Sequence, residues 1–225
     1  VESRRVFKLR TSVKASEEDF YKVRQELQNK SASVPAPRRE KPRLELARFY
    51  FARGFAPESE GVLAAMAGAN PRLSSEPEFK ALRGAVAALR EDYGFAAENL
   101  RDSRLDNYEE IELWRGLAAA GVKNWKAANL YFKRGDGVLA QYPPALRIKI
   151  GLIRANTALQ ARDPESANSW LQRIGKFSAD MSRSQRAALE FLRARVAFVN
   201  RNLDKATELW TGLVDGPDAY YAAQS

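Results

Sequence analysis

The residues of this chain that could perform acid–base chemistry are two pairs of adjacent glutamates, Glu17 with Glu18 and Glu109 with Glu110. General acid–base catalysis needs groups that reach one reacting atom together. Adjacent residues on a helix do not face each other. Both pairs instead suit the first turn of a helix, where solvated negative side chains complement the helix dipole. We therefore predict that the chain has no catalytic residues and is not an enzyme.

The chain of 225 residues contains no cysteine and no histidine. This excludes disulfide bonds, thiol nucleophiles, the usual zinc sites and every catalytic triad that needs histidine. No carboxylate cluster has the spacing of a calcium loop, and no glycine-rich phosphate loop is present. We expect no metal and no cofactor. The lack of cysteine favours the periplasm slightly over the cytoplasm, since it suits an oxidising compartment.

The charge balance is basic, with 37 Lys and Arg against 28 Asp and Glu and a formal net charge of +9. Such a field favours acidic partners and speeds their association. No uncharged apolar run approaches the roughly 18 residues of a membrane span, so we expect no membrane insertion. The chain begins at Val1, and residues 219–225 read as the start of a further helix. We therefore expect a fragment or a processed product of a larger bacterial protein.

The pattern of the chain changes near residue 42. Residues 1–41 comprise a basic segment, a single helix and an extended Ser/Pro-rich linker from Asn29 to Pro42. The apolar face of this single helix consists of Phe20, Val23 and Leu27. Over residues 42–225, helix-period segments of about 12 to 18 residues alternate with short breaks, and no β-alternating run is present. We predict a domain boundary between these two parts.

Capping residues predict where several helices begin. Ser16 is a candidate N-cap, and Asp163 stands before a proline and a glutamate. Two further starts have the spacing of a capping box, Asn107 with Glu110 and Ser182 with Gln185.

Five segments of the second part superpose as a repeat. Each has a small residue in its first helix: Ala47, Gly84, Gly116, Ala155 and Ala194. These residues are separated by 37, 32, 39 and 39 positions. Twelve positions after each lies a second small residue: Ser59, Ala96, Ala128, Ala167 and Ala206. Four positions further on lies a large apolar residue: Leu63, Leu100, Phe132, Leu171 and Trp210. Self-similarity at this period is typical of helical-repeat proteins.

This pattern resembles the tetratricopeptide repeat, in which two antiparallel helices approach closely at small residues and a bulky residue fills the gap to the next repeat. The resemblance implies an all-α fold, a right-handed α–α superhelix of about five helix–turn–helix repeats, preceded by one helix and a linker. The Trp and Leu that the family places in the first helix are mostly absent, and all but one interval exceeds the family's usual 34 residues. A Sel1-like or other α-solenoid has the same physical behaviour.

The resemblance also implies a ligand groove lined by the first helix of each repeat. By repeat position the lining residues are Leu113, Leu117, Leu152, Asn156, Phe191, Arg195 and Phe198. This set lacks the paired Lys and Asn with which chaperone-binding members of the family hold a carboxylate. An apolar groove suits an amphipathic helix or an extended segment of another protein. The alternative is that a neighbouring part of the same protein fills it.

An arginine precedes the small residue in four of the repeats: Arg83, Arg115, Arg154 and Arg193. We call this set the arginine ladder. The structural interpretation, which we favour, is that the stems pack along the helices and the heads pair with second-helix carboxylates such as Glu98 and Glu208. The functional interpretation is a positive stripe that binds an acidic ligand.

Two functions are consistent with these patterns. The first is a non-catalytic scaffold for protein–protein interaction, serving a multiprotein complex such as a cell-envelope, secretion or motility assembly. The alternative is a helical-repeat module that binds nucleic acid through its basic surface. Aromatic residues do not alternate with the arginine ladder, so we favour the scaffold. A salt series distinguishes the two, because binding to phosphates weakens steeply as salt increases.

Overall fold

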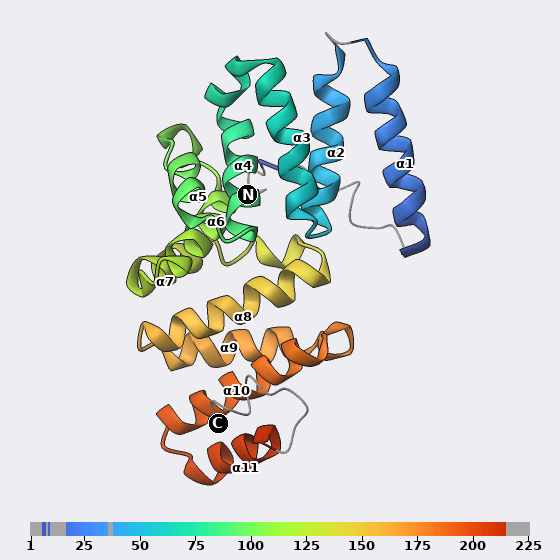
Figure 1. Ribbon diagram of the computed structural model, residues 1–225. Helices are drawn as coiled ribbons and strands as arrows, with labels where there is room; N and C mark the ends of the chain where they lie inside the picture. Colours follow the sequence, from blue (N-terminus) through green and yellow to red (C-terminus); the bar gives the residue numbers. More distant parts are fainter. Residues whose placement is uncertain (1–5, 8, 10–16, 36–37, 215–225) are drawn as a thin grey trace.

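The structure is a computed structural model that describes residues 6–7, 9, 17–35 and 38–214. Within these residues there are eleven α-helices and no strand, which confirms the all-α fold class (Figure 1). No helix in the described part of the chain is long and apolar enough to cross a membrane.

Helix α1 (Glu17–Ser33) precedes five pairs of consecutive helices that pack against each other. The pairs are α2 (Glu40–Ala52) with α3 (Ala56–Ala69), α4 (Pro77–Leu89) with α5 (Tyr93–Leu100), α6 (Glu109–Gly121) with α7 (Trp125–Arg134), α8 (Pro144–Gln160) with α9 (Pro164–Gly175), and α10 (Arg183–Val199) with α11 (Leu203–Val214). We call the first helix of each pair helix A and the second helix B. A short 3-10 turn joins each pair to the next, at Pro71–Ser75, Ser103–Leu105, Leu139–Gln141 and Ser178–Asp180.

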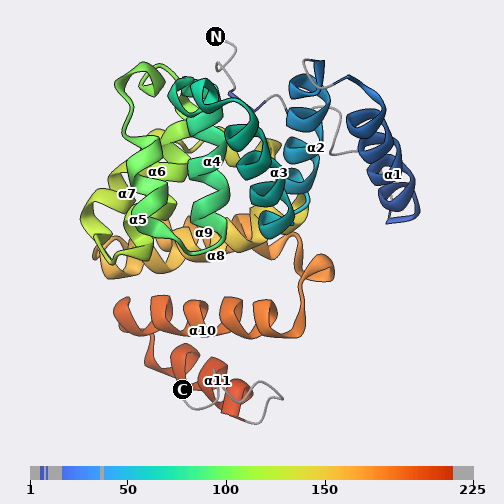
Figure 2. The same ribbon diagram turned by 45° about the horizontal axis from the view of Figure 1, so that its top comes forward.

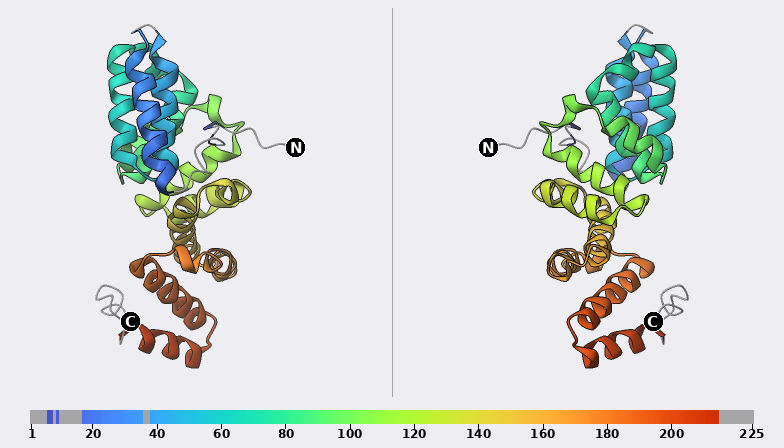
Figure 3. Two further views of the ribbon diagram at one scale, coloured as in Figure 1. Left: turned by 90° about the vertical axis from the view of Figure 1, so that its right-hand side faces the viewer. Right: turned by 90° about the vertical axis from the view of Figure 1, so that its left-hand side faces the viewer.

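The pairs follow one another through the molecule in chain order. Each helix B contacts helix A of the next pair, and the A helices α4, α6, α8 and α10 contact one another in sequence. Figure 2 shows α10 and α11 beyond α8 and α9. Both side views in Figure 3 place α10 and α11 at the opposite end from the N-terminal helices. The predicted helix pairs are thus confirmed as units that pack on their neighbours.

The repeat positions are packing positions in the structure. The small residues of the A helices are buried, as are those of the B helices. A Cβ atom on Gly84 would lie 2.7 Å from Cγ of Leu100, and one on Gly116 would lie 2.5 Å from Cδ1 of Phe132. In the second and third pairs the bulky residue therefore packs on the small residue of its own pair, whereas the sequence pattern had predicted that it fills the gap to the next pair.

The turn between the two helices of every pair contains one residue with a positive φ angle. These residues are Gly54 (80°), Glu91 (66°), Lys123 (59°), Arg162 (61°) and Arg201 (61°), each seven positions after the small residue of helix A. In the last four pairs the next residue is Asp or Asn, and its side chain accepts a hydrogen bond from a backbone N–H in the first turn of helix B. This recurring turn fixes where each helix B begins.

The predicted helix starts have different outcomes. Asp163 caps α9, and Ser182 with Gln185 forms the complete capping box of α10, as predicted. The start at Asn107 with Glu110 is wrong, because α6 begins at Glu109 after Tyr108 and the Glu110 side chain is buried. Ser16 lies outside the described residues.

The linker before the first pair is shorter than predicted. Helix α1 continues to Ser33, and α2 begins at Glu40, so the extended segment does not run from Asn29 to Pro42. Pro42 instead lies in the first turn of α2, where a missing backbone N–H costs no helical hydrogen bond. The predicted apolar face of α1 packs against Leu46, Phe49 and Tyr50 of α2, which confirms that face.

A segment near the N-terminus is part of the core. Val6, Phe7 and Leu9 are all buried, and they belong to the same apolar cluster as the first three helix pairs. Residues on both sides of position 42 therefore contact each other, and the division of the chain at that position stays a prediction. The helix predicted to start at residue 219 lies outside the described residues.

Candidate functional site

A groove of about 640 Å³ lies between α6, α8 and α10, at several of the predicted lining residues. We call it the A-helix groove. Its apolar and aromatic lining comprises Tyr93, Leu117, Ala120, Trp125, Leu152, Ile153, Ala188, Phe191 and Leu192. Its polar lining comprises Lys123, Lys149, Asn156, Gln160, Gln185 and Arg195, together with the backbone at Gly121. The groove thus combines an apolar floor with amide and cationic side chains.

The structure brings five of the seven predicted groove residues together. Leu117, Leu152, Asn156, Phe191 and Arg195 all line the A-helix groove.

The other two predicted residues lie elsewhere. Leu113 is completely buried in the core. Phe198 is 54% exposed and packs beside Trp210, with 5.6 Å between ring centroids.

The groove has three cationic side chains. None of Lys123, Lys149 and Arg195 forms an ion pair with another residue in the described part of the chain. Arg195 donates a hydrogen bond to Oδ1 of Asn156 across 3.0 Å, which links α10 to α8. Burial lowers the pKa of the Arg195 guanidinium, and this position remains cationic at neutral pH because arginine titrates so far above it.

Sequence reasoning missed several lining residues that the repeat could have revealed. Ile153 and Leu192 both stand two positions before the small residue of their helix, and Lys149 and Ala188 both stand six positions before it. These positions share a helix face with the predicted ones, since residues three or four apart are neighbours on a helix. Tyr93 and Trp125 are first residues of B helices, and no A-helix pattern could indicate them.

The first three pairs present a different surface, because the chain itself covers it. The ring of Phe7 lies 5.2 Å from that of Phe51 in α2 and 6.3 Å from that of Trp114 in α6. The backbone N–H groups of Val6 and Phe7 donate to one carboxylate oxygen of Glu110, at 2.9 and 3.1 Å. A segment of the same chain therefore covers the A helices at this end of the molecule, whereas none of the described residues fills the A-helix groove.

Glu110 is a structural anchor in this arrangement. Its second carboxylate oxygen accepts a hydrogen bond from the Tyr142 hydroxyl at 2.6 Å, and that hydroxyl accepts one from Nε1 of Trp114. The side chain is only 3% exposed, so the expectation of a solvated first-turn glutamate is wrong here. Burial is tolerated because three donors satisfy the carboxylate. Among the described residues, no group of acidic side chains could hold a metal ion.

The arginine ladder makes contacts within the protein, mostly to the preceding pair. Arg83 pairs with Glu60 of α3 at 2.7 Å. Arg115 donates from Nε to the carbonyl of Leu100 at the end of α5, and Arg154 donates to the carbonyl of Phe132 in the last turn of α7. The last carbonyl groups of a helix have no hydrogen-bond partner within the helix. The arginines donate to these carbonyls, and their positive charge complements the negative end of the helix dipole.

Among the described residues, the ladder does not pair with the two carboxylates predicted as examples, although Arg83 does pair with a helix-B carboxylate, Glu60. Glu208 pairs with Lys205, and Arg193 pairs with Glu190 of its own helix. Arg115 pairs with Glu112 and Asp106. The partners differ because each ladder arginine points toward the preceding pair or along its own helix, whereas Glu98 and Glu208 belong to the following helix B.

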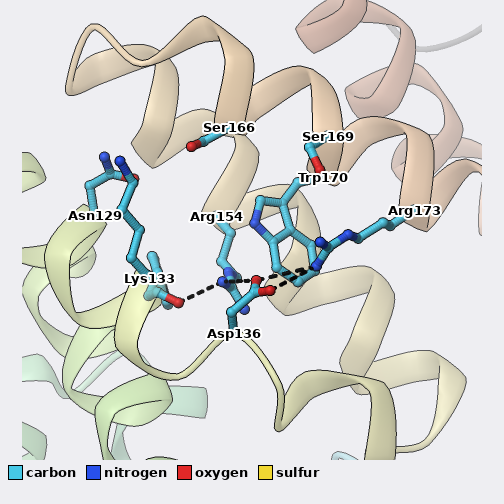
Figure 4. A pocket seen from close by; sticks show the side chains of 9 residues that line it. Asn129, Lys133, Asp136, Arg154, Ser166, Ser169, Trp170 and Arg173 are labelled. Atoms are coloured by element: carbon cyan, nitrogen blue, oxygen red, sulfur yellow. Dashed lines mark hydrogen bonds and ion pairs between the residues drawn. The ribbon is translucent and has the colours of Figure 1, made fainter.

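Arg154 lies at the centre of a second cavity of about 250 Å³, between α7, α8 and α9 (Figure 4). Asp136 accepts hydrogen bonds from Arg154 at 2.9 Å and from Arg173 at 3.1 Å. Both guanidinium groups lie over the Trp170 ring, at 3.6 and 4.7 Å from its centroid. Burial lowers the pKa of Arg154 to about 10, so it stays charged at neutral pH. These contacts join the third pair to the fourth.

No family model, curated protein or solved structure matches this chain. The geometry and chemistry of the A-helix groove are therefore the basis on which a function is assigned.

Proposed function

We propose that this protein is a non-catalytic scaffold that binds a segment of another protein in the A-helix groove. The observation that carries the proposal is the groove itself, in which five residues chosen by repeat position line one cavity. Grooves with an apolar floor and a few polar groups are the usual receptors for peptide segments. The multiprotein complex that such a scaffold serves, in the cell envelope or elsewhere, belongs to the same proposal.

The proposal includes the finer description of the fold. The five pairs are arranged as a right-handed superhelix of the tetratricopeptide type, with the A helices on its inner face. Two features support this description: the small and bulky residues that meet within the second and third pairs, and the turn geometry that recurs in all five pairs. Nearly identical units that each contact only their neighbours form superhelices with extended inner surfaces.

The test is position-specific photocrosslinking in cells that express the protein. A photoreactive phenylalanine analogue replaces Leu152 in the groove or, as the control, Glu165 at the start of α9, which does not line the groove. We expect a discrete protein adduct from position 152 and none from position 165. The same adduct from both positions, or no protein adduct from either, would contradict the proposal.

Nucleic-acid binding is the alternative, and the same experiment distinguishes it. Irradiation would then link the groove position to nucleic acid, and the yield would fall steeply as salt increases. The structure favours the scaffold on one specific point. The ladder arginines are engaged in internal hydrogen bonds and ion pairs, so they do not form a free stripe of positive charge.

A further inference from the structure

We propose that the occupant of the A-helix groove is an extended, acidic segment of a partner protein, in which carboxylate side chains alternate with apolar ones. This inference rests on the proposed function and adds the chemistry of the ligand. It is argued from the two ends of the same surface, one covered by the chain and one open.

The covered end shows how the A helices hold a segment of chain, here the described residues Val6, Phe7 and Leu9. There the apolar side chains of Val6 and Phe7 are buried, and an acidic side chain, Glu110, accepts the backbone N–H groups of the segment. At this end, α6 supplies a negatively charged acceptor, and the N-terminal segment supplies backbone N–H donors.

The open end has the opposite chemistry. The side chains that line the A-helix groove include three cations and no carboxylate. Lys123 and Lys149 are exposed to solvent, and Arg195 is half-buried. Arg195 donates to Oδ1 of Asn156 at 3.0 Å, and Lys149 donates to the carbonyl of Leu89 at 3.4 Å. A ligand would supply acceptors for Lys123 and for the remaining N–H groups of the other two cations. Carboxylates match cationic donors most strongly, and complementary charge also accelerates encounter.

The dimensions of the groove suit a short extended segment. It spans three A helices, α6, α8 and α10. Packed helices lie about 8–10 Å apart, so the groove extends roughly 20 Å. An extended chain rises about 3.3 Å per residue, which corresponds to about six residues. Successive side chains of such a chain point to opposite sides, so one set meets the floor at Leu117, Leu152 and Leu192 while the other meets the cations at the rim.

The backbone of such a segment also finds partners. Asn156, Gln160 and Gln185 line the groove, and a carboxamide both donates and accepts hydrogen bonds. The oxygens of Asn156 and Gln185 already accept from Arg195 and from the backbone of Ser182, so these two residues offer a ligand mainly their N–H donors. An extended backbone leaves its N–H and C=O groups unpaired, whereas a helix satisfies them internally. Amide side chains in the groove are therefore of use to an extended ligand and of little use to a helical one.

Single-stranded nucleic acid is the competing ligand, because cations and aromatic rings also bind it. The floor of the groove argues against it. Leu117, Leu152, Ile153, Ala188 and Leu192 are aliphatic. The aromatic residues of the lining, Tyr93, Trp125 and Phe191, come from three different helices, so they do not form a row along one helix on which successive bases would stack. Three cations over this distance also make a sparse track for a phosphate backbone.

The test uses three fluorescein-labelled peptides of eight residues, in which Leu alternates with Glu, with Gln or with Lys, and an eight-nucleotide oligothymidylate. Each is titrated with the whole chain, and binding is followed by fluorescence anisotropy at about 0.15 M salt. We expect the Glu peptide to bind at least tenfold more tightly than the Gln peptide, and the Lys peptide and the oligonucleotide to bind more weakly still.

A charge-reversal pair tests the site. The double variant Lys149→Glu with Arg195→Glu is expected to lose at least tenfold in affinity for the Glu peptide and to bind the Lys peptide better than the unmodified chain does. The matched control is Arg186→Glu with Arg183→Glu, which changes two exposed arginines at the start of α10 that do not line the groove. This control keeps its preference for the Glu peptide. Circular dichroism and denaturation midpoints confirm that all variants are folded.

The outcomes separate the two proposals. Equal affinity for all three peptides, abolished by Leu152→Asp, would overturn the acidic ligand and leave the scaffold standing. Preferential binding of the oligonucleotide would overturn both. Preference for the Glu peptide that survives in the groove double variant would show that general surface charge is responsible, and would overturn the acidic ligand in the groove.

Discussion

At the scale of single residues, the turn between the paired helices has an unusual feature. Four of its five positive-φ positions hold Glu, Lys or Arg where glycine would be free of strain. A non-glycine residue in this region costs about 1 kcal/mol or more. The chain tolerates this cost because the next residue caps helix B and the backbone closes the turn, as at Asp163, whose N–H donates to the carbonyl of Ala158.

The first prediction follows from this strain. Arg162→Gly is expected to raise the free energy of unfolding by about 0.5–1 kcal/mol, because the backbone strain at this position is relieved. The side chain that is removed is exposed, so its loss removes no buried contact. Denaturant titration measures the change. The control is Arg186→Gly in the ordinary helical backbone of α10, which is expected to destabilise the protein by about 1 kcal/mol. Changes of the same sign at both positions would contradict the interpretation of the turn.

The second prediction concerns Asp163 and pH. Burial alone raises the pKa of this carboxyl, but hydrogen bonds from Lys133, Ser166 and Asn129 hold it well below its usual range. A carboxyl with a lowered pKa in the folded state stabilises the fold above its unfolded pKa of about 3.9, and this contribution is lost as the pH falls further.

Asp163→Asn tests that contribution because asparagine also caps a helix but cannot form the 2.7 Å ion pair with Lys133. We expect the variant to be less stable than the original at pH 7 and the difference to narrow as the pH is lowered from about 5 to 2. Thermal unfolding across this range provides the measurement. A difference that stays constant with pH would mean that the charge of Asp163 contributes nothing.

At the scale of elements, a small residue of helix A contacts a bulky residue of helix B in the second and third pairs. The third prediction is that Gly116→Ala destabilises the protein by about 1–3 kcal/mol, because the new methyl group would overlap the ring of Phe132. Gly94→Ala is the control, since a Cβ there meets nothing within 4 Å, and it is expected to stabilise α5 by up to about 1 kcal/mol.

A double variant identifies the ring as the cause of this loss. Adding Phe132→Leu to Gly116→Ala is expected to cost less than the sum of the two single changes, since the smaller side chain makes room for the methyl group. If the free-energy changes of the two single variants simply add, Gly116 is needed for a reason other than the ring of Phe132.

The helix pairs could be predicted from the sequence because close packing restricts residue size locally. Ala47, Gly84 and Ala155 are small for the same physical reason, so a simple period reveals them. The turns were harder to predict, because Glu91, Lys123 and Arg162 carry no glycine signal for a positive φ angle. The Asp or Asn that follows these residues in four pairs marks the start of helix B, as predicted at Asp163, but it does not indicate that the residue before it has a positive φ angle.

Part of the groove could also be predicted from the repeating positions of the sequence. Positions on helix A repeat, so five of the seven expected residues line it. Leu113 does not, because the chain after α7 covers that position, and the backbone of Gly135 lies against it. Whether the first residues of α5 and α7 reach the groove depends on how neighbouring pairs are oriented. The repeat of residue types along helix A carries no information about that orientation.

At the scale of the whole molecule, the contact that sequence patterns could not indicate is the one between the N-terminal segment and α6. It joins residues about 100 positions apart, with Glu110 accepting from the backbone of Val6 and Phe7. Helical-repeat proteins are stabilised mainly by contacts between neighbouring units. This segment adds a link from the first pair to the third, so we infer that the first three pairs unfold as one cooperative unit.

The fourth prediction tests that unit. Phe7→Ala removes a buried ring from between Phe51 and Trp114 and is expected to cost about 3 kcal/mol. Hydrogen exchange measured by mass spectrometry should show lower protection throughout α2, α4 and α6, with α10 and α11 unchanged, because local stability differs between cooperative units. The control Phe198→Ala, at a ring that is 54% exposed, is expected to cost less than about 1 kcal/mol. Loss of protection confined to α2 would contradict the prediction, because it would show that the segment packs on the first three pairs without coupling them. An equal loss of protection in α10 and α11 would also contradict it, because the whole chain would then unfold as a single unit.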